Sequence, residues 1–349
     1  MLGGGIFVTQ NKILPGSYIN FVSAERASAT LGVRGVVAIA LPLGKEVGSV
    51  IELTRSEFVQ NSNELLGKSY DSDDLLPLRE IFCNATKVYV YDIGVADAAK
   101  TVAEACAAFE PYEFNVLCAY TSTASDITAY VTQVKSWRND MGKKCQLVVY
   151  NAATAPDHEG VINVVSTVSN AGVSPYALTA WVAGAEAGCE VNRSITNKKY
   201  DGELTIVTDK TQSQLEACIT NGQLAFHLVY GDICVLEDIN SLTTTSVDKG
   251  EDFKSNQTIR VIDQIANDIA KLFNTKYLGK IPNDAPGRIS LWGDIVKHHQ
   301  QLEEIRAIEN FDPTLVTVAQ GNTKKAVVVN DVITVTNAMA QLYMTVVIQ

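Results

Sequence analysis

The sequence predicts an α/β (α+β) protein, in which a middle domain with a mixed sheet precedes a C-terminal domain of helices and strands. Between residues 87 and 150, short apolar runs alternate with stretches of helical periodicity, as in strand-helix-strand units. Residues 252–310 indicate two amphipathic helices, and both chain ends are strand-like. We therefore predict four segments: an N-terminal arm at 1–22, an α/β domain at 23–249, and a C-terminal domain at 250–349 that ends in a second arm at 341–349.

The N-terminal arm contains two short strand-like runs separated by a turn. Ile6 and Val8 belong to the first run, and Tyr18 and Phe21 belong to the second. Pro15-Gly16 between them favours a turn. The arm is therefore expected to supply strands to a sheet.

The middle of the chain alternates between predicted strands and helices, which favours a parallel or mixed sheet. Acidic residues at 71–74 predict a capped helix; a calcium loop is the alternative, but its glycine and distal glutamate are missing. The uncharged run 160–185 is too rich in Asn and Ser for a membrane span and predicts a buried strand and helix. Within it, Ala183-Gly184 and Ala187-Gly188 predict close helix packing. We predict strands at 34–40, 87–91, 115–120, 146–150 and 204–207, helices at 71–81, 97–109, 124–141 and 211–220, and a hairpin of 224–229 with 233–236.

Two helices are predicted at the start of the C-terminal domain. In the first, apolar residues spaced three and four apart share one face, and Thr258 is a candidate N-cap. Pro286-Gly287-Arg288 then predicts the start of a second helix that ends near Asn310. The apolar row of the first helix is Ile259, Ile262, Ile265, Ile269 and Leu272, opposite Asp263, Gln264, Asn267 and Lys271; that of the second is Ile289, Trp292, Ile295 or Val296, Leu302 and Ile305.

The last residues are the most informative stretch in physical terms. From Ala326 to the end, Asp331 is the only charged residue, and the predicted strand 341–349 has apolar residues on both faces. An unpaired strand of this kind is an aggregation template, so we expect it to pair with another strand. Either the arms add to the sheet of a neighbouring subunit, or the two ends pair within one molecule. The expected contact residues of this arm are Leu342, Tyr343, Met344, Val346 and Ile348.

Composition and motifs argue against several function classes. The chain has 39 acidic and 28 basic residues, a net charge of −11, and no basic stripe, which argues against nucleic-acid binding. The N-terminus lacks the pattern of a secretory signal, and seven cysteines without a CxxC pair favour a reducing cytoplasm. The phosphate-binding loop and nucleophile-elbow motifs are missing. We therefore predict no catalytic residue, cofactor or metal, although a metal site of His299 with Glu303 is geometrically possible.

Several stretches resemble the contractile tail sheath proteins of bacteriophages and phage-derived bacteriocins. Their order and spacing along almost the whole chain carry the resemblance, which is greatest to the short sheaths of Gram-positive phage-like particles. The stretches are 14–21 with 34–38; 180–188 with Ser194 and Thr196; 260–263; 277–280 with Asn283; and Ala338-Met339 with 342–346.

The resemblance implies a structural subunit that is assembled in the bacterial cytoplasm and becomes part of a phage tail or a phage-tail-like particle. Subunits would stack as six-membered rings into a helical sheath around an inner tail tube, with baseplate and tail-terminator proteins as further partners. No nucleic acid and no membrane insertion is implied. Contraction of the sheath would drive the tube through a target cell envelope.

The resemblance also assigns roles to parts of the chain. Both arms would join strands of neighbouring subunits, next to a hairpin of 315–318 with 326–335, while the α/β domain would face outward. The helix at 286–310 would touch the tube, although ordinary solvation of its polar face is an alternative. The candidate tube contacts are Arg288, Lys297, His298, His299 and Arg306.

Two other hypotheses remain at this level. A soluble α/β enzyme or small-ligand binding protein with internally paired ends would need a site, and the motifs for one are missing. Another tail component, such as a baseplate protein, is disfavoured by motifs that span the full chain.

Overall fold

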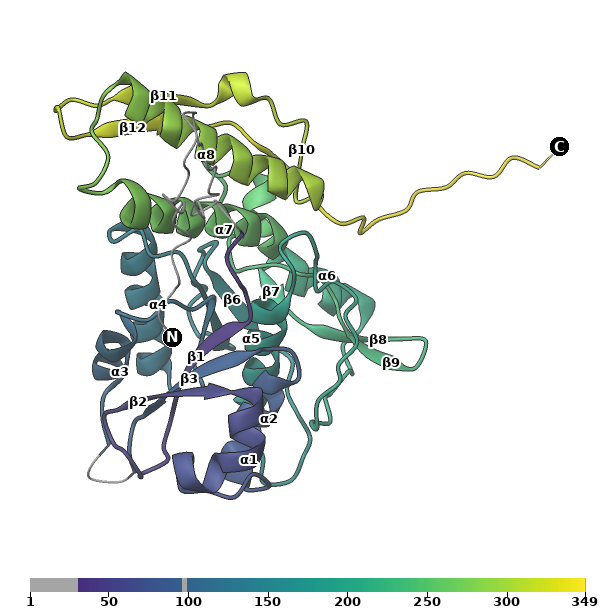
Figure 1. The fold of residues 1–349 in the computed structure, drawn as a ribbon. Coiled ribbons are helices and arrows are strands. Elements are labelled where there is room, and N and C mark those ends of the chain that lie inside the picture. Colours follow the sequence, from purple (N-terminus) through teal and green to yellow (C-terminus); the bar gives the residue numbers. More distant parts are fainter. Residues whose placement is uncertain (1–30, 96–98, 349) are drawn as a thin grey trace, which may run out of the picture.

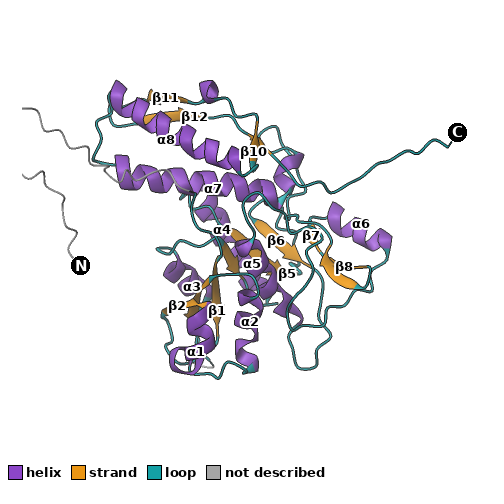
Figure 2. Cartoon of the chain, turned by 45° about the vertical axis from the view of Figure 1, so that its right-hand side comes forward, coloured by secondary structure: helices purple, strands orange, loops and turns teal. Residues whose placement is uncertain are grey.

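The computed structural model describes residues 31–95 and 99–348, which form an α/β domain with a C-terminal domain packed on it (Figure 1). The long helix α7 (Asn256–Leu272) lies between the two, and helix α8 (Ala285–Glu304) lies above it (Figure 2). The N-terminal arm residues Ile6, Val8, Tyr18 and Phe21 lie outside the described residues.

The α/β domain is built on a seven-stranded sheet with the strand order β2-β3-β1-β4-β5-β6-β7. Neighbouring strands are parallel except at one edge, where β2 runs antiparallel to β3. The predicted mixed α/β sheet is therefore confirmed. The strands are β1 (Val36–Leu41), β2 (Val50–Thr54), β3 (Lys87–Asp92), β4 (Val116–Cys118), β5 (Gln146–Tyr150), β6 (Val161–Val164) and β7 (Gln223–Leu224).

Helices cover both faces of this sheet. Along β1, Val37 and Ile39 point into one hydrophobic cluster while Ala38 and Ala40 point into the other, because successive side chains of a strand alternate between faces. This two-sided burial explains the continuous apolar runs of the central strands. Helices α1 (Arg55–Leu66), α2 (Leu76–Phe82) and α5 (Leu178–Gly188) contribute to the first cluster, and α3 (Val102–Phe109) and α4 (Ala124–Asn139) to the second.

Two glycines let helices α2 and α5 approach closely. A Cβ atom on Gly184 would collide with the carbonyl oxygen of Ile81, and one on Gly188 with that of Asn84. The prediction of close packing from the small residues of this helix is therefore confirmed.

A protruding hairpin leaves the sheet after β7, beside helix α6 (Gln212–Thr220). It consists of β8 (Phe226–Val229) and β9 (Asp232–Val235), and Tyr230 and Gly231 at its turn both have positive φ, as a two-residue hairpin turn requires. The hairpin prediction is confirmed. The predicted strand at 204–207 is wrong, because Ile206 makes only an isolated bridge with Val168.

The C-terminal domain packs helix α8 against short two-stranded sheets. Strands β11 (Thr317–Gln320) and β12 (Val327–Asn330) form an antiparallel hairpin, and β10 (Ile308–Glu309) pairs with β13 (Thr334–Val335). The π-helical turn Phe273–Tyr277 follows α7. The 3-10 turns of the described chain are Asp73–Leu75, Pro175–Ala177, Glu251–Lys254 and Pro313–Leu315.

Several details of the two long helices differ from prediction. Ser255, not Thr258, occupies the N-cap position of α7, without a capping hydrogen bond from its side chain, and Thr258 is buried in the first turn of the helix. Its polar side, with Asp263 and Gln264, is also buried, because α7 contacts both domains. Helix α8 ends at Glu304 rather than near Asn310, and Ile289, predicted to belong to its apolar row, is 66% exposed.

Among the described residues, no helix has the length and apolar character needed to cross a membrane.

Candidate assembly interface

The C-terminal tail is held to the body at its base and leaves the body immediately afterwards (Figure 1). Thr336 N–H donates to the carbonyl of Ala307 (3.0 Å), and the Gln257 side chain bonds both Thr336 O (3.1 Å) and Ala338 N (2.9 Å). Thr258 Oγ1 donates to Asn337 Oδ1 (3.2 Å). The described residues beyond Ala338 make no hydrogen bond to the rest of the described chain, so Ala338 is the last fixed point.

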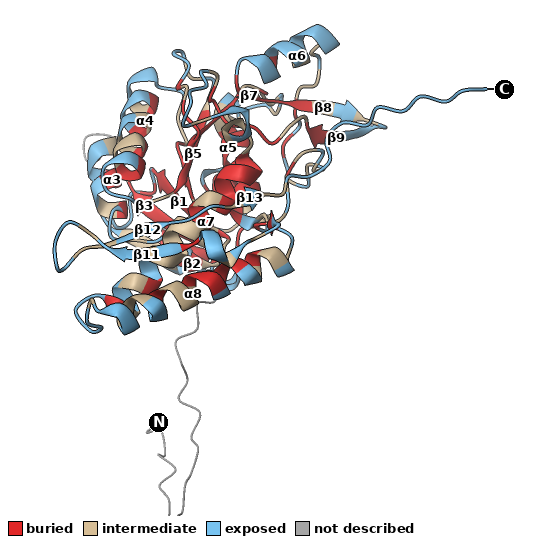
Figure 3. Cartoon of the chain, turned by 90° about the horizontal axis from the view of Figure 1, so that it is seen from above, coloured by how far each residue is buried: buried red, intermediate tan, exposed pale blue. Residues whose placement is uncertain are grey.

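Beyond that point, residues 341–348 run away from the body as an exposed segment without strand pairing (Figure 3). Large apolar side chains along it are between 69% and 92% exposed, and they occupy both faces of the extended chain. Residues 341–348 therefore make no strand pair with the described residues of their own chain, while the N-terminal arm of the alternative hypothesis lies outside the described residues. The exposed residues are Leu342, Tyr343, Met344, Val346, Val347 and Ile348.

The hairpin of β11 with β12 is a separate two-stranded sheet of the C-terminal domain. Val328 and Val329 on β12 are 46% and 38% exposed, although both are apolar. One side of the hairpin rests on α8, where Trp292 Nε1 donates to Val316 O (3.0 Å). Because a two-stranded hairpin is marginally stable by itself, this small sheet is a natural acceptor for an added strand.

Four of the five candidate tube contacts lie on helix α8, Arg306 follows its end, and the structure separates the five into two groups. Lys297 and Arg306 are exposed, and Arg288 donates to the backbone carbonyl (3.1 Å) and the side chain (3.0 Å) of Asn283. His298 and His299 are 1% and 0% exposed, so the prediction that they are surface contacts is wrong. Both rings bond aspartates inside the domain instead.

The alternative of a metal site at His299 also finds no support in the geometry. His299 Nε2 bonds Asp331, and Glu303 Oε1 accepts from Phe311 N–H (3.0 Å). Across the described ranges, no three His, Cys, Asp or Glu side chains are grouped as metal ligands.

A buried ionic cluster fixes α7, and with it the C-terminal domain, to the α/β domain. The Arg260 guanidinium lies against Glu186 of α5 and 3.3 Å from Asp238, which follows β9, and all three side chains are buried. Nearby, Arg138 of α4 makes a two-pronged pair with Asp263 of α7 (2.5 and 2.8 Å). Glu186, Arg260 and Asp263 are members of the stretches that carried the family resemblance, so these stretches meet in space.

The carboxyl groups of Glu186 and Asp238 share the Arg260 guanidinium, and their pKa values shift in opposite directions. Burial and the neighbouring Asp238 raise the pKa of Glu186 well above its usual range. Despite burial, the Arg260 guanidinium and hydrogen bonds hold the pKa of Asp238 below its usual range. The Arg260 guanidinium thus compensates the buried negative charge of Asp238.

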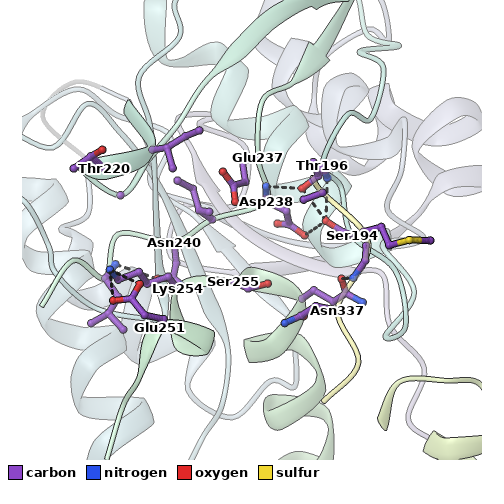
Figure 4. Close-up of a pocket in the computed structure, with 18 residues that line it drawn as sticks. Ser194, Thr196, Thr220, Glu237, Asp238, Asn240, Glu251, Lys254, Ser255 and Asn337 are labelled. Carbon is purple, nitrogen blue, oxygen red and sulfur yellow. Dashed lines mark hydrogen bonds and ion pairs between the residues drawn. The ribbon is translucent and has the colours of Figure 1, made fainter. Parts of the chain in front are cut away.

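A cavity of about 510 Å³ lies where the tail leaves the body, between Asp238, the start of α7 and residues 337–340 (Figure 4). Ser194 Oγ bonds both Asp238 (3.2 Å) and Thr196 (3.0 Å) at its wall. The resemblance stretches containing Ser194, Thr196 and Ala338-Met339 thus surround the tail's exit. The sequence analysis did not predict that these stretches meet, because the resemblance was based only on their order and spacing along the chain.

Comparison with known protein families gives two matches that together cover more than half of the chain. Residues 94–241 match the phage tail sheath protein central domain, and residues 248–349 match the phage tail sheath C-terminal domain. The chain belongs to the phage tail sheath family.

Relatives and solved structures agree with this assignment. The tail sheath protein of Clostridium phage phiCD119 is 30% identical over 176 residues, which cover 50% of this chain and 49% of the relative. The crystal structure of a sheath tail protein from Desulfitobacterium hafniense is 26% identical with a TM-score of 0.76, covering 87% of this chain and 93% of that chain. The helical sheath of the anti-feeding prophage in its contracted state is 17% identical with a TM-score of 0.72, over 95% of this chain and 98% of that one, and shows the shared fold.

The matched regions make up less than half of each curated relative. The chain spans between 46% and 49% of the length of the curated relatives it matches. The activity and partners of the whole protein are therefore matters of proposal.

Proposed function

We propose that this chain is the structural subunit of a contractile tail sheath, which polymerises helically around an inner tail tube and contracts to drive that tube through a cell envelope. One observation carries the proposal: in a chain of the tail sheath family, an uncharged apolar tail extends from the body without a partner strand in residues 341–348. The proposal assigns the protein a mechanical role and no catalytic step.

In this proposal, the tail of one subunit adds a strand to the β11–β12 hairpin of a neighbouring subunit. Each backbone hydrogen bond of an added strand contributes about 0.5–1.5 kcal/mol net. Burial of exposed side chains such as Leu342 and Val346 adds about 1.5–3 kcal/mol each. The donor and acceptor surfaces differ, so the contact is heterologous and generates a ring or a filament rather than a closed dimer.

The position of the tail's base also suits a sheath that changes its lattice. The tail is fixed at Thr336, Asn337 and Ala338, and its described remainder has no further attachment to the body. A strand joined in this way keeps two subunits connected while their other surfaces slide and rotate. Contraction then proceeds between two packings of the same subunits, as in other bistable assemblies.

Partners and orientation follow as parts of the same proposal. We place the C-terminal domain inside, with α8 and its exposed Lys297 towards the inner tube, and the α/β domain outside. Arg288 and Arg306 remain candidate tube contacts, and the N-terminal arm remains a candidate second link. Stacked six-membered rings, baseplate and terminator partners, and assembly in the bacterial cytoplasm complete the proposal.

Negative-stain electron microscopy of the purified chain, across a range of concentrations and salt, tests it. We expect hollow, striated tubes of uniform width. Only compact particles under every condition, including in the presence of the matching tube protein, would contradict the proposal.

A pair of matched variants tests whether the tail makes the tubes. Val346→Lys places a charge on the exposed tail, and Val247→Lys places the same charge on a fully exposed loop residue of the other domain. We expect the first to prevent tubes and the second to leave them. Equal behaviour of the two variants would contradict a role for the tail strand.

A further inference from the structure

Two buried histidine rings and two aspartates form a continuous chain of contacts through the C-terminal domain, and the Asp331 side chain at one end is 26% exposed. His298 Nε2 lies 3.0 Å from Asp268 Oδ2, and His299 Nε2 lies 2.6 Å from Asp331 Oδ2. The two Nδ1 atoms of the rings lie 3.4 Å apart. The chain therefore runs from α7 through α8 to the residue that follows β12.

The two ends of this chain lie at the bases of both terminal segments. Asp268 Oδ2 also accepts from Gly32 N–H (3.0 Å), near the start of the described chain, and Gln264 donates to Gly32 O (3.3 Å). Asp331 begins the segment that continues through β13 to the tail's last fixed point at Ala338. We call Leu31 and Gly32 the N-terminal root, and residues 331–338 the C-terminal root.

The contacts of the two rings constrain where their protons can lie. Each Nε2 faces a carboxylate oxygen, which only accepts, so each Nε2 carries a proton. Two Nδ1 atoms that face each other need one proton between them, because two lone pairs or two N–H groups repel. The pair therefore holds three ring protons, one more than two neutral imidazoles have.

We propose that Asp268, His298, His299 and Asp331 form one proton-binding chain that couples the N-terminal root to the C-terminal root. The extra proton belongs to the ring pair rather than to either ring. Losing it places two lone pairs together, and gaining another places two N–H groups together, so either change breaks the contact between the rings. The coupling is therefore strongest where three protons are bound and weakens on both sides of that state.

The surroundings of the rings are consistent with a single positive charge. The charged groups that contact the rings, within the described ranges, are Asp268 from α7 and Asp331 after β12. Glu303, one turn along α8, is held by the Phe311 amide, and the Phe311 ring lies 5.1 Å from that of His299. Asp331 is also the only charged side chain from residue 326 onwards, so this otherwise uncharged segment carries its one charge at the ring pair.

The proton count can be measured on the unmodified protein. With ¹⁵N-labelled histidine, the nitrogen spectrum distinguishes protonated from bare ring nitrogens, in solution or in assembled tubes. His158→Gln and His227→Gln variants remove the other two histidines and assign the signals. At neutral pH we expect three protonated nitrogens and one bare nitrogen from His298 and His299. Two bare nitrogens, or none, would overturn the proposal.

The coupling is tested by hydrogen exchange of the full chain with two variants. Asp331→Asn removes the charge at one end of the chain, and we expect the Gly32 amide at the other end to exchange about tenfold faster, as for a weakened charge-assisted hydrogen bond. Asn337→Ala is the control, because it loosens the C-terminal root at Thr258 without touching the rings. It should speed exchange at Thr336 but leave Gly32 unchanged. An unchanged Gly32 in Asp331→Asn, or an equal effect of both variants on Gly32, would overturn the coupling.

Discussion

The α/β domain and the C-terminal domain differ in how far each completes its own sheets. In the first, seven strands are covered by helices on both faces, and central strands such as β1 are almost fully buried. In the second, strands β11 and β12 stand as a pair with mostly exposed residues, and the tail beyond Ala338 is unpaired as far as Ile348. The first region thus obtains its stability from within the chain, whereas the second presents surfaces that further strands can complete.

This difference predicts that mutations in the two regions have different consequences. Changes within the α/β domain, or in the helix that joins it to the C-terminal domain, should alter the free energy of unfolding of the single chain. Changes in the tail should leave that free energy almost unchanged and alter assembly.

The largest loss of stability is expected from Arg260→Met. Removing the guanidinium leaves Glu186 and Asp238 buried without their cation, which costs about 3–5 kcal/mol. Arg193→Met, at an exposed pair with Glu190, is the control and should cost no more than about 1 kcal/mol. Urea unfolding measures both, and equal costs would show that the cluster does not join the domains.

Glycine replacements in two helices should have opposite signs. Gly184→Ala places a Cβ against the Ile81 carbonyl and should destabilise the chain by about 1–3 kcal/mol through overpacking. Gly293 of α8 has open space around its Cβ position, so Gly293→Ala should stabilise by about 0.5–1 kcal/mol through helix propensity. Thermal unfolding distinguishes the two, and a stabilising Gly184→Ala would contradict the close packing of α2 with α5.

A smaller, pH-dependent effect is expected at His158. Burial lowers the pKa of His158 from 6.5 to about 4, and its Nδ1 accepts from Gly160 N–H (3.0 Å), so the folded chain keeps this ring neutral. Between these pH values the unfolded chain binds more protons, and the contribution of His158 to stability falls as the pH falls.

The matching variant is His158→Gln, which does not titrate. Its loss of stability relative to the unmodified chain should be larger above pH 6.5 than near pH 4, as measured by urea unfolding at each pH. A loss that grows as the pH falls would mean that the folded chain binds the proton instead.

Local sequence patterns predicted the regular parts of this fold well. Strand β5 has the predicted bounds, 146–150, because a short apolar run between a polar helix and a turn has few alternatives. The segment 204–207 has the same local pattern, but it forms only one bridge, because β7 rather than this segment occupies the sheet position next to β6. Local pattern therefore predicts that a segment can form a strand, whereas the neighbours in the fold decide whether it does.

The sequence predicted the exposed tail of the candidate site. It did not predict the burial of the two histidines, which depends on partners far away in the chain. The apolar residues from Leu342 to Ile348 were predicted as an arm from their own composition, and they are exposed. His298 and His299 were expected on the surface because the family resemblance assigned their helix to the contact with the tube. Their partners Asp268 and Asp331 are 30 and 32 residues away, and no local pattern joins them, although the isolated charge of Asp331 was the available signal.

The most direct test of the central claim is to compare the full chain with a chain that lacks residues 341–349, measuring unfolding and assembly on the same samples. Because the described tail makes no contact that stabilises the single chain, we expect the free energy of unfolding to change by less than about 0.5 kcal/mol. The shortened chain should form no tubes under conditions in which the full chain does. Tubes formed by the shortened chain, or a large loss of stability in the single chain, would contradict the account.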